Sequence, residues 1–288
     1  MRFMRCAVSE PAMTDKIALS VIVTTLNEEK NLPRCLAALD AFDEVIIADS
    51  NSEDATGSVA RSFGASVVNF SWNGAYPKKR QWCLDNLPLK HDRIFFVDAD
   101  EEVTGGLLSE IAALDWNCAG YFVKGVYTLN AKPLRRGIVN NKLCLFDRRL
   151  VHFPVVDDLE ISGMGEMEGH YQPVLKDGVC ATVGQLKNPL YHHAMEDAGK
   201  YVERHERYAA WEAGMRLYKA YPAENAMGRK ILKRIFGSMP FRPVAAFLHS
   251  YILKGGFLDG KGGLHLSAAR YKYYARVRYA EKQRRAGK

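Results

Sequence analysis

The sequence predicts an α/β fold with a mainly parallel central sheet, followed by a basic helical extension. Over the first hundred residues, short runs of Val, Ile and Phe alternate with segments of helical periodicity, which is typical of right-handed β-α-β units. The charge is divided as well. Residues 227–288 contain 15 Lys and Arg but only 2 Asp and Glu, against 25 and 31 in residues 1–226. At 288 residues, the chain is long enough for one large α/β domain with an extension.

The elements are expected in a regular order. The β-branched run at 17–23 has few polar residues, as in a strand buried on both faces, and apolar residues then recur at helical spacing from Leu32 to Leu39. The alternation continues with strands at 44–48, 66–70 and 93–97 and helices at 54–63 and 80–86. From about Tyr121 we expect a more antiparallel section, with strands at 121–127 and 142–146, a basic loop at 132–137 and a long helix at 197–218.

Polar clusters follow the first, second and fourth predicted strands. They are Asn27-Glu28, Asp49-Ser50-Asn51-Ser52 and Asp98-Ala99-Asp100. Parallel strands end at the same edge of a sheet, where open α/β sheets bind their ligands. An Asp-x-Asp pair alone is often a solvated turn, but its hard oxygens also suit Mg²⁺ bound to substrate phosphates. The convergence of three clusters favours one polar pocket over three separate solvated loops.

Three segments, at 20–29, 46–54 and 96–101, resemble in order and spacing the motifs of family-2 glycosyltransferases with the GT-A fold. Later segments, at 190–193, 201–208 and 254–263, are similar to a subgroup that extends the lipopolysaccharide inner core with glucose or a related hexose. The resemblance implies an inverting transferase that moves a hexose from a UDP-sugar to a lipid-linked saccharide.

The resemblance also implies a donor site at the predicted strand ends. Asp49 would accept a hydrogen bond from the N–H of uracil, and Glu28 would line the nucleoside pocket. Asp100 would coordinate a Mg²⁺ or Mn²⁺ ion that bridges the two phosphates, while Asp98 suits either the ribose or the metal. Arg80, on the helix before the Asp-x-Asp strand, would add a second positive group. The whole donor set is Thr24, Thr25, Leu26, Asn27, Glu28, Asp49, Ser50, Arg80, Asp98, Ala99 and Asp100.

An inverting transfer needs a general base near the acceptor hydroxyl. The subgroup places a carboxylate after a Val-His pair, and Asp158 falls on that position here, with Asp157 where the subgroup has His. Because of this departure, Asp157 and Glu160 remain alternatives to Asp158. The role of the pair His192-His193 is also left open, since these side chains could contact the diphosphate or the metal, or have a structural role only.

The chain is expected to comprise an N-terminal tail at 1–15, a GT-A domain at 16–226 and a basic amphipathic extension at 227–288. Basic and aromatic residues together suit an anionic membrane surface, and nucleic acid is an unlikely partner because no nucleic-acid-binding motif accompanies them. The sequence shows no signal peptide, no long apolar span and no paired cysteine motif. We therefore expect a cytoplasmic protein, peripheral on the inner face of the cytoplasmic membrane.

Two other functions fit parts of the sequence. A nucleotidyltransferase shares the sheet and the metal site, but it would need a glycine- and arginine-rich phosphate loop near the first strand, and the segment from Thr24 to Glu29 contains no glycine. A non-catalytic sugar-nucleotide sensor with a membrane- or nucleic-acid-binding tail would bind the donor without turning it over.

Overall fold

The computed structural model describes residues 16–156, 159, 161, 164, 171–220, 236, 237, 239 and 241–287. The three candidate bases, Asp157, Asp158 and Glu160, lie outside the described residues, as does the boundary expected between residues 226 and 227. The three-part division of the chain, and the choice of base, stay predictions.

The first half of the chain alternates strands and helices as expected. The elements are β1 (Ile17–Thr25), α1 (Leu32–Ala37), β2 (Phe42–Asp49), α2 (Thr56–Ser62), β3 (Ser66–Asn69), α3 (Lys79–Asn86), β4 (Arg93–Asp98), β5 (Glu101–Val103) and α4 (Gly105–Ala112). Strands dominate the middle, with β6 (Gly120–Leu129), β7 (Lys132–Pro133), β8 (Asn140–Asp147), β9 (Val151–His152), β10 (Val174–Leu175), β11 (Val183–Gln185) and β12 (Leu190–His192). The C-terminal part is helical, with α5 (Ala198–Tyr218), α7 (Arg242–Leu248), a π-helical turn η1 (His249–Leu253), a 3₁₀ turn η2 (Gly256–Asp259) and α8 (Gly260–Arg285).

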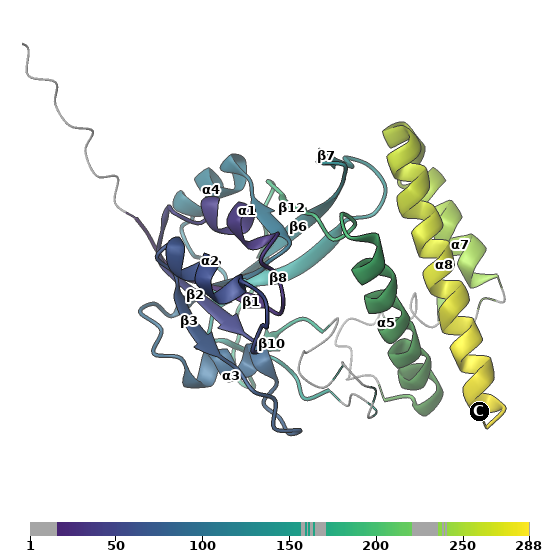
Figure 1. The fold of residues 1–288 in the computed structure, drawn as a ribbon, viewed down its shortest axis with the longest axis horizontal. Coiled ribbons are helices and arrows are strands. Elements are labelled where there is room, and N and C mark those ends of the chain that lie inside the picture. The colour runs from purple at the N-terminus through teal and green to yellow at the C-terminus, as the bar shows by residue number, and fades with distance from the viewer. Residues whose placement is uncertain are drawn as a thin grey trace, which may run out of the picture.

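One large sheet organises the fold (Figure 1). Its strand order is β3-β2-β1-β4-β8-β6-β12-β5. The first four of these strands are parallel to one another, which confirms the β-α-β arrangement. Beyond β4 the direction changes, because β8 is antiparallel to both β4 and β6. Strand β12 then runs parallel to β6 and antiparallel to β5. The more antiparallel section expected from Tyr121 onward is therefore confirmed.

The core is centred on β1, which lies between β2 and β4. Its side chains Val21, Ile22 and Val23 are fully buried, as the β-branched run predicts for a strand covered on both faces. Burial of each such side chain contributes about 1.5–3 kcal/mol relative to exposure. Leu32 and Cys35 of α1 belong to the same core cluster. The ends of these central strands are therefore held firmly, and the polar clusters with them.

Helices α5, α7 and α8 lie together on one side of the molecule, away from the parallel strands (Figure 1). Ala209 and Ala213 of α5 form a small apolar cluster with Val277 of α8. Glu281 of α8 also binds Arg216 of α5, at 2.6 Å, and the buried Arg242 of α7, at 3.2 Å. The C-terminal helices thus pack onto α5 through both apolar and ionic contacts. Among the described helices, none is long and apolar enough to cross a membrane.

The contact between α8 and η2 depends on a glycine. A Cβ atom added at Gly263 of α8 would lie 1.7 Å from the carbonyl oxygen of Gly256, far inside van der Waals contact. We expect Gly263→Ala to lower the free energy of unfolding by about 1–3 kcal/mol, the usual cost of overpacking. Urea unfolding followed by circular dichroism measures the change. Gly105→Ala is the matched control, because a Cβ atom at Gly105, the first residue of α4, meets nothing within 4 Å. Equal unfolding midpoints for the two variants would contradict the expectation.

Candidate functional site

The register of the parallel strands brings the predicted clusters to one edge of the sheet. Thr24 of β1 is paired with Asp98 of β4, and Thr25 is paired with Asp49 of β2. The Thr25 hydroxyl donates to the Asp49 carboxylate at 2.7 Å. The Thr24 hydroxyl lies 3.4 Å from a carboxylate oxygen of Asp98. The expected convergence of the first, second and fourth strands is therefore present.

Asp49 is buried and helps to line a pocket at this edge. Its carboxylate accepts hydrogen bonds from the backbone N–H of Ser52, at 2.7 Å, and from the Ser52 hydroxyl, at 2.6 Å. The pocket has a volume of about 390 Å³, and its polar lining residues are Asp49, Asn51, Ser52, Asp54, Ser58, Arg61 and Asn69. A volume of this size is within the range of small-molecule sites. Hydrogen bonds to both Asp49 oxygens hold the carboxylate in a fixed orientation at the pocket wall.

The loops after β1 and β2 are tied to each other. The backbone N–H of Asn27 donates to the Ser52 hydroxyl, and that of Glu28 donates to the Thr56 hydroxyl, both at 2.8 Å. Asn27 has a φ of 55°, in the left-handed region that Asn tolerates better than most residues. Ser50 contacts the ammonium of the buried Lys79, which also donates to the Thr25 carbonyl at 2.9 Å. Leu26, by contrast, exposes half of its side chain to solvent.

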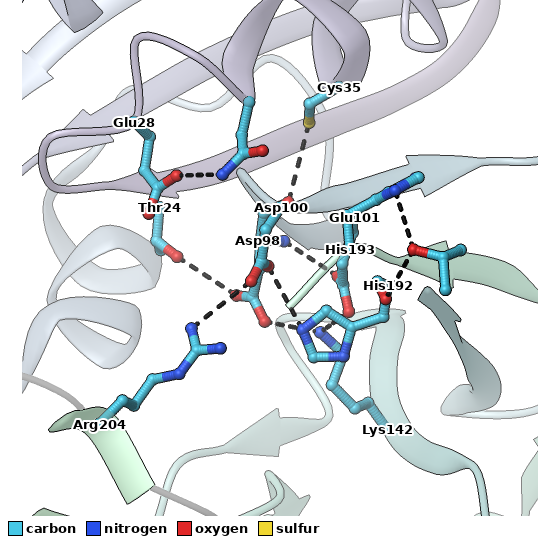
Figure 2. A network of polar contacts seen from close by, with 12 residues as sticks. Thr24, Glu28, Cys35, Asp98, Asp100, Glu101, Lys142, His192, His193 and Arg204 are labelled. Carbon is cyan, nitrogen blue, oxygen red and sulfur yellow. Dashed lines mark hydrogen bonds and ion pairs between the residues drawn. The ribbon is translucent and has the colours of Figure 1, made fainter. Parts of the chain in front are cut away.

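Asp98 lies between two cations, Arg80 and Lys142, of which Figure 2 shows Lys142. Arg80 donates to one carboxylate oxygen at 2.7 Å, and Lys142 of β8 donates to the other at 2.8 Å. Lys142 also forms an ion pair with the fully buried Glu101, whose carboxylate accepts the backbone N–H of Asp98 at 3.0 Å. Burial alone would raise the pKa of Asp98, but Lys142 and Arg80 outweigh it and hold that pKa well below its usual range. Asp98 is thus ionised and fully paired with the protein's own cations.

Asp100 faces a different pair of groups (Figure 2). One carboxylate oxygen is 3.4 Å from Nε2 of His192, and the other is 3.4 Å from a guanidinium nitrogen of Arg204 on α5. Burial would raise the pKa of Asp100, yet His192 and Arg204 together lower it to about 2. The carboxylate therefore stays ionised over the whole neutral range.

The two adjacent histidines have different surroundings. Strand β12 pairs with β5, and the backbone N–H of His193 donates to the carbonyl of Asp100 at 2.8 Å, which holds His192 against the Asp100 carboxylate. The ring of Tyr127 stacks on His192 with centroids 5.1 Å apart. His193 instead contacts the carboxylates of Glu102 and Glu196. Of the pair, His192 belongs to the site and His193 supports the local structure.

The donor atoms around Asp100 fit a divalent cation. A buried carboxylate and an imidazole nitrogen 3.4 Å apart can share one ion, and this mixture of oxygen and nitrogen suits Mn²⁺ as well as Mg²⁺. In the described parts of the chain, no cluster of three or more His, Cys, Asp or Glu side chains is placed to hold a metal. The remaining ligands would come from a bound phosphate and from water, as is usual for Mg²⁺. Asp98 is the poorer ligand, because both of its oxygens already face cations.

Sequence patterns did not identify Lys142 or Arg204 as part of this site. They come from strand β8 and helix α5, far along the chain from the Asp-x-Asp segment. The charge of Lys142 next to the apolar run at 143–146 is the one local signal, and it does not indicate which residue Lys142 pairs with. The sequence leaves the role of His192 open, since a His-His pair alone does not show which ring faces the site.

Comparison with known proteins agrees with this geometry. Residues 20–142 match the model of the family described as glycosyl transferase family 2. An uncharacterized glycosyltransferase of Rickettsia bellii is 37% identical over 100 residues, which cover 34% of this chain and 32% of the relative. The lipopolysaccharide core biosynthesis glycosyltransferase LpsC of Rhizobium meliloti is 30% identical over 119 residues, which cover 38% of this chain and 43% of the relative. The aligned regions thus span less than half of either relative.

Among solved structures, S. aureus TarS 1–349 is similar with a TM-score of 0.46 and 18% identity, over 94% of this chain and 92% of that one. The family match falls on the segment that forms β1 through β4, continues to β8 and contains the Asp-x-Asp site. Residues 20–142 thus match the model of glycosyl transferase family 2, and this segment supplies the parallel strands β1, β2, β3 and β4 of an α/β fold.

Proposed function

We propose that this chain is an inverting glycosyltransferase that moves a hexose from a UDP-sugar to a lipid-linked saccharide such as the lipopolysaccharide inner core. Glucose is the first candidate for the hexose. The observation that carries the proposal is Asp100, ionised and facing His192 and Arg204, at the strand edge that also carries the Asp49 pocket. The name of the Rhizobium meliloti relative supports a lipopolysaccharide core acceptor. The proposed place of action is the inner face of the cytoplasmic membrane.

Donor binding follows from the two parts of this edge. The pocket at Asp49 takes the nucleoside, and Asp49 accepts the N–H of the base on the oxygen lone pairs that its internal hydrogen bonds leave available. The diphosphate lies toward Asp100, where Arg80, Lys142 and Arg204 concentrate positive charge. Asp100 and His192 would hold a Mg²⁺ or Mn²⁺ ion, which would supply charge to neutralise the diphosphate.

Transfer with inversion is a single displacement at the anomeric carbon. The acceptor hydroxyl oxygen forms a bond to that carbon as the bond from the carbon to the diphosphate oxygen breaks, and the bonding electron pair leaves with the diphosphate. The acceptor proton passes to a carboxylate, for which Asp158 is the first candidate and Asp157 or Glu160 the alternatives. Fixed cations near the leaving group stabilise the charge as it develops there.

A screen of nucleotide-sugars for release of nucleoside diphosphate, with Mn²⁺ or Mg²⁺ and with or without lipopolysaccharide precursors, tests the proposal. We expect release from a UDP-hexose that depends on the cation and increases when the acceptor is present. The Asp158→Asn variant should bind the donor as the wild type does but lose turnover, because the base is gone. Pyrophosphate release from a nucleoside triphosphate would instead show a nucleotidyltransferase. Donor binding without any turnover by the wild type would show a sensor.

A further inference from the structure

The segment that includes α7 exposes much apolar surface. Phe241, Val244, Leu248 and Ile252 follow one another at helical spacing, and each exposes a large part of its side chain. Leu253 and Phe257, in and after η1, continue the exposed apolar surface, with Leu253 77% exposed. We call these six residues the α7 face. Single exposed apolar side chains are normal on protein surfaces, but a contiguous group of them indicates a surface that contacts an apolar partner.

The other side of α7 and η1 is well packed. Ala246 and Ser250 are buried, and Ser250 accepts a hydrogen bond from the Ser267 hydroxyl of α8 at 3.0 Å. Arg242 lies buried between Glu281 and the ring of Tyr274. Because α7 is anchored in this way, its exposed side chains are presented on a fixed scaffold.

Cations from a distant part of the sequence lie beside this surface. The basic loop that follows β7 is joined to the η1–η2 region by two hydrogen bonds, from Gly137 N–H to the Lys254 carbonyl at 2.9 Å and from Arg136 N–H to the Asp259 carboxylate at 2.7 Å. Figure 1 shows this loop reaching toward the N-terminal end of α8. The contact brings Arg135 and Arg136 to the same region as Lys254 and Lys261.

These four cations are exposed, and none forms an ion pair with the residues that the structure describes. A second copy of the chain seated here would bring like charges together, whereas an anionic partner would neutralise them. The six apolar side chains of the α7 face require a partner with an apolar interior as well. An anionic lipid bilayer offers both, with its acidic headgroups above the acyl chains.

We propose that the α7 face, with Arg135, Arg136, Lys254 and Lys261 around it, docks onto an anionic lipid bilayer. This inference rests on the proposed lipid-linked acceptor and identifies the surface that meets the membrane. Helix α8 packs both on α7 and on α5, and α5 supplies Arg204 to Asp100. Docking through α7 therefore sets the position of the donor site relative to the bilayer that carries the acceptor.

Co-sedimentation of the full chain with phosphatidylcholine vesicles, with and without phosphatidylglycerol, tests the docking surface. The wild type should partition onto the anionic vesicles. The Leu253→Gln/Phe257→Gln variant should bind them at least about tenfold more weakly, because two large apolar side chains no longer enter the acyl region. The Arg135→Gln/Arg136→Gln variant should bind anionic vesicles about 30-fold more weakly than the wild type. Its binding to vesicles without phosphatidylglycerol should not change.

The matched control is Phe63→Gln/Lys124→Gln, which removes an exposed aromatic and an exposed cation from elsewhere on the surface. It should bind as the wild type does. Wild-type binding by either test variant would overturn the inference, as would a dimer that the Leu253→Gln/Phe257→Gln variant separates into monomers. Transfer to a soluble, delipidated saccharide should persist in both test variants. If no sugar donor supports transfer at all, the proposed function fails while the vesicle result still decides the docking surface.

Discussion

Replacement of Lys142 by Met is expected to lower the free energy of unfolding by about 3–5 kcal/mol, the cost of leaving a buried charge without its partner. Lys142 is the cation shared by Asp98 and Glu101, and Glu101 is fully buried. Asp98 keeps Arg80 after the replacement, but Glu101 loses its ion-pair partner. Urea unfolding at neutral pH measures the loss.

Two further variants separate the ionic effect from a simple loss of packing. Lys142→Met/Glu101→Gln should recover a large part of the stability, because the neutral amide no longer needs a cation. Lys124→Met, on the neighbouring strand β6, removes an exposed lysine and should change the stability by less than about 0.5 kcal/mol. Equal losses in Lys142→Met and in the double variant would show that the ion pair is not the cause.

Replacement of Asp100 by Asn is expected to reduce kcat/KM for sugar transfer on the order of 10²–10³-fold, because the cation that Asp100 would hold no longer offsets the charge on the leaving diphosphate. Asn has nearly the same shape as Asp, so the fold should persist. The Asn side chain, however, lacks the negative charge that binds a divalent cation. The variant should also lose the dependence of UDP binding on Mn²⁺, which titration calorimetry measures with and without the ion.

Glu102→Gln is the matched control for this change. Glu102 is two residues away, but its carboxylate contacts His193 at 3.0 Å rather than the cation-facing side of Asp100. This variant should keep Mn²⁺-dependent UDP binding. Loss of that dependence in both variants would mean that disturbance of the β5–β12 pairing, rather than the Asp100 charge, explains the result.

The sequence allowed the donor edge of the fold to be predicted because its pattern is local. A β-branched run such as Val21–Val23 encodes a buried strand by itself, and the rule that parallel strands end at one edge then places Asp49 and Asp98 near each other. The pairing of Thr24 with Asp98 and of Thr25 with Asp49 follows from the same register.

The charges around the two carboxylates could not be predicted in the same way. Lys142 reaches Asp98 because β8 lies next to β4, and Arg204 reaches Asp100 because α5 returns to the sheet after β12. No local pattern in the sequence indicates either contact, because each depends on how elements far apart in the chain pack together. The same is true of the basic loop at 132–137, whose place beside Lys254 and Asp259 appears only in the tertiary structure.

The contacts of Asp98 and Asp100 agree with the different roles that the resemblance implies for them. It implies Asp100 as the metal ligand and leaves Asp98 between the ribose and the metal. In the structure Asp98 is paired with Arg80 and Lys142, whereas Asp100 faces His192. We therefore propose Asp100 and His192 as the metal-binding pair, with Asp98 organising the cations beside it.

A crystal structure of the protein with UDP and Mn²⁺, read through the anomalous signal of manganese, tests the central claim most directly. We expect one anomalous peak at coordination distance, about 2 Å, from both the Asp100 carboxylate and Nε2 of His192, with the diphosphate of UDP completing the site. A peak bound to Asp98 instead, or UDP bound at the Asp49 pocket with no manganese beside Asp100, would contradict it.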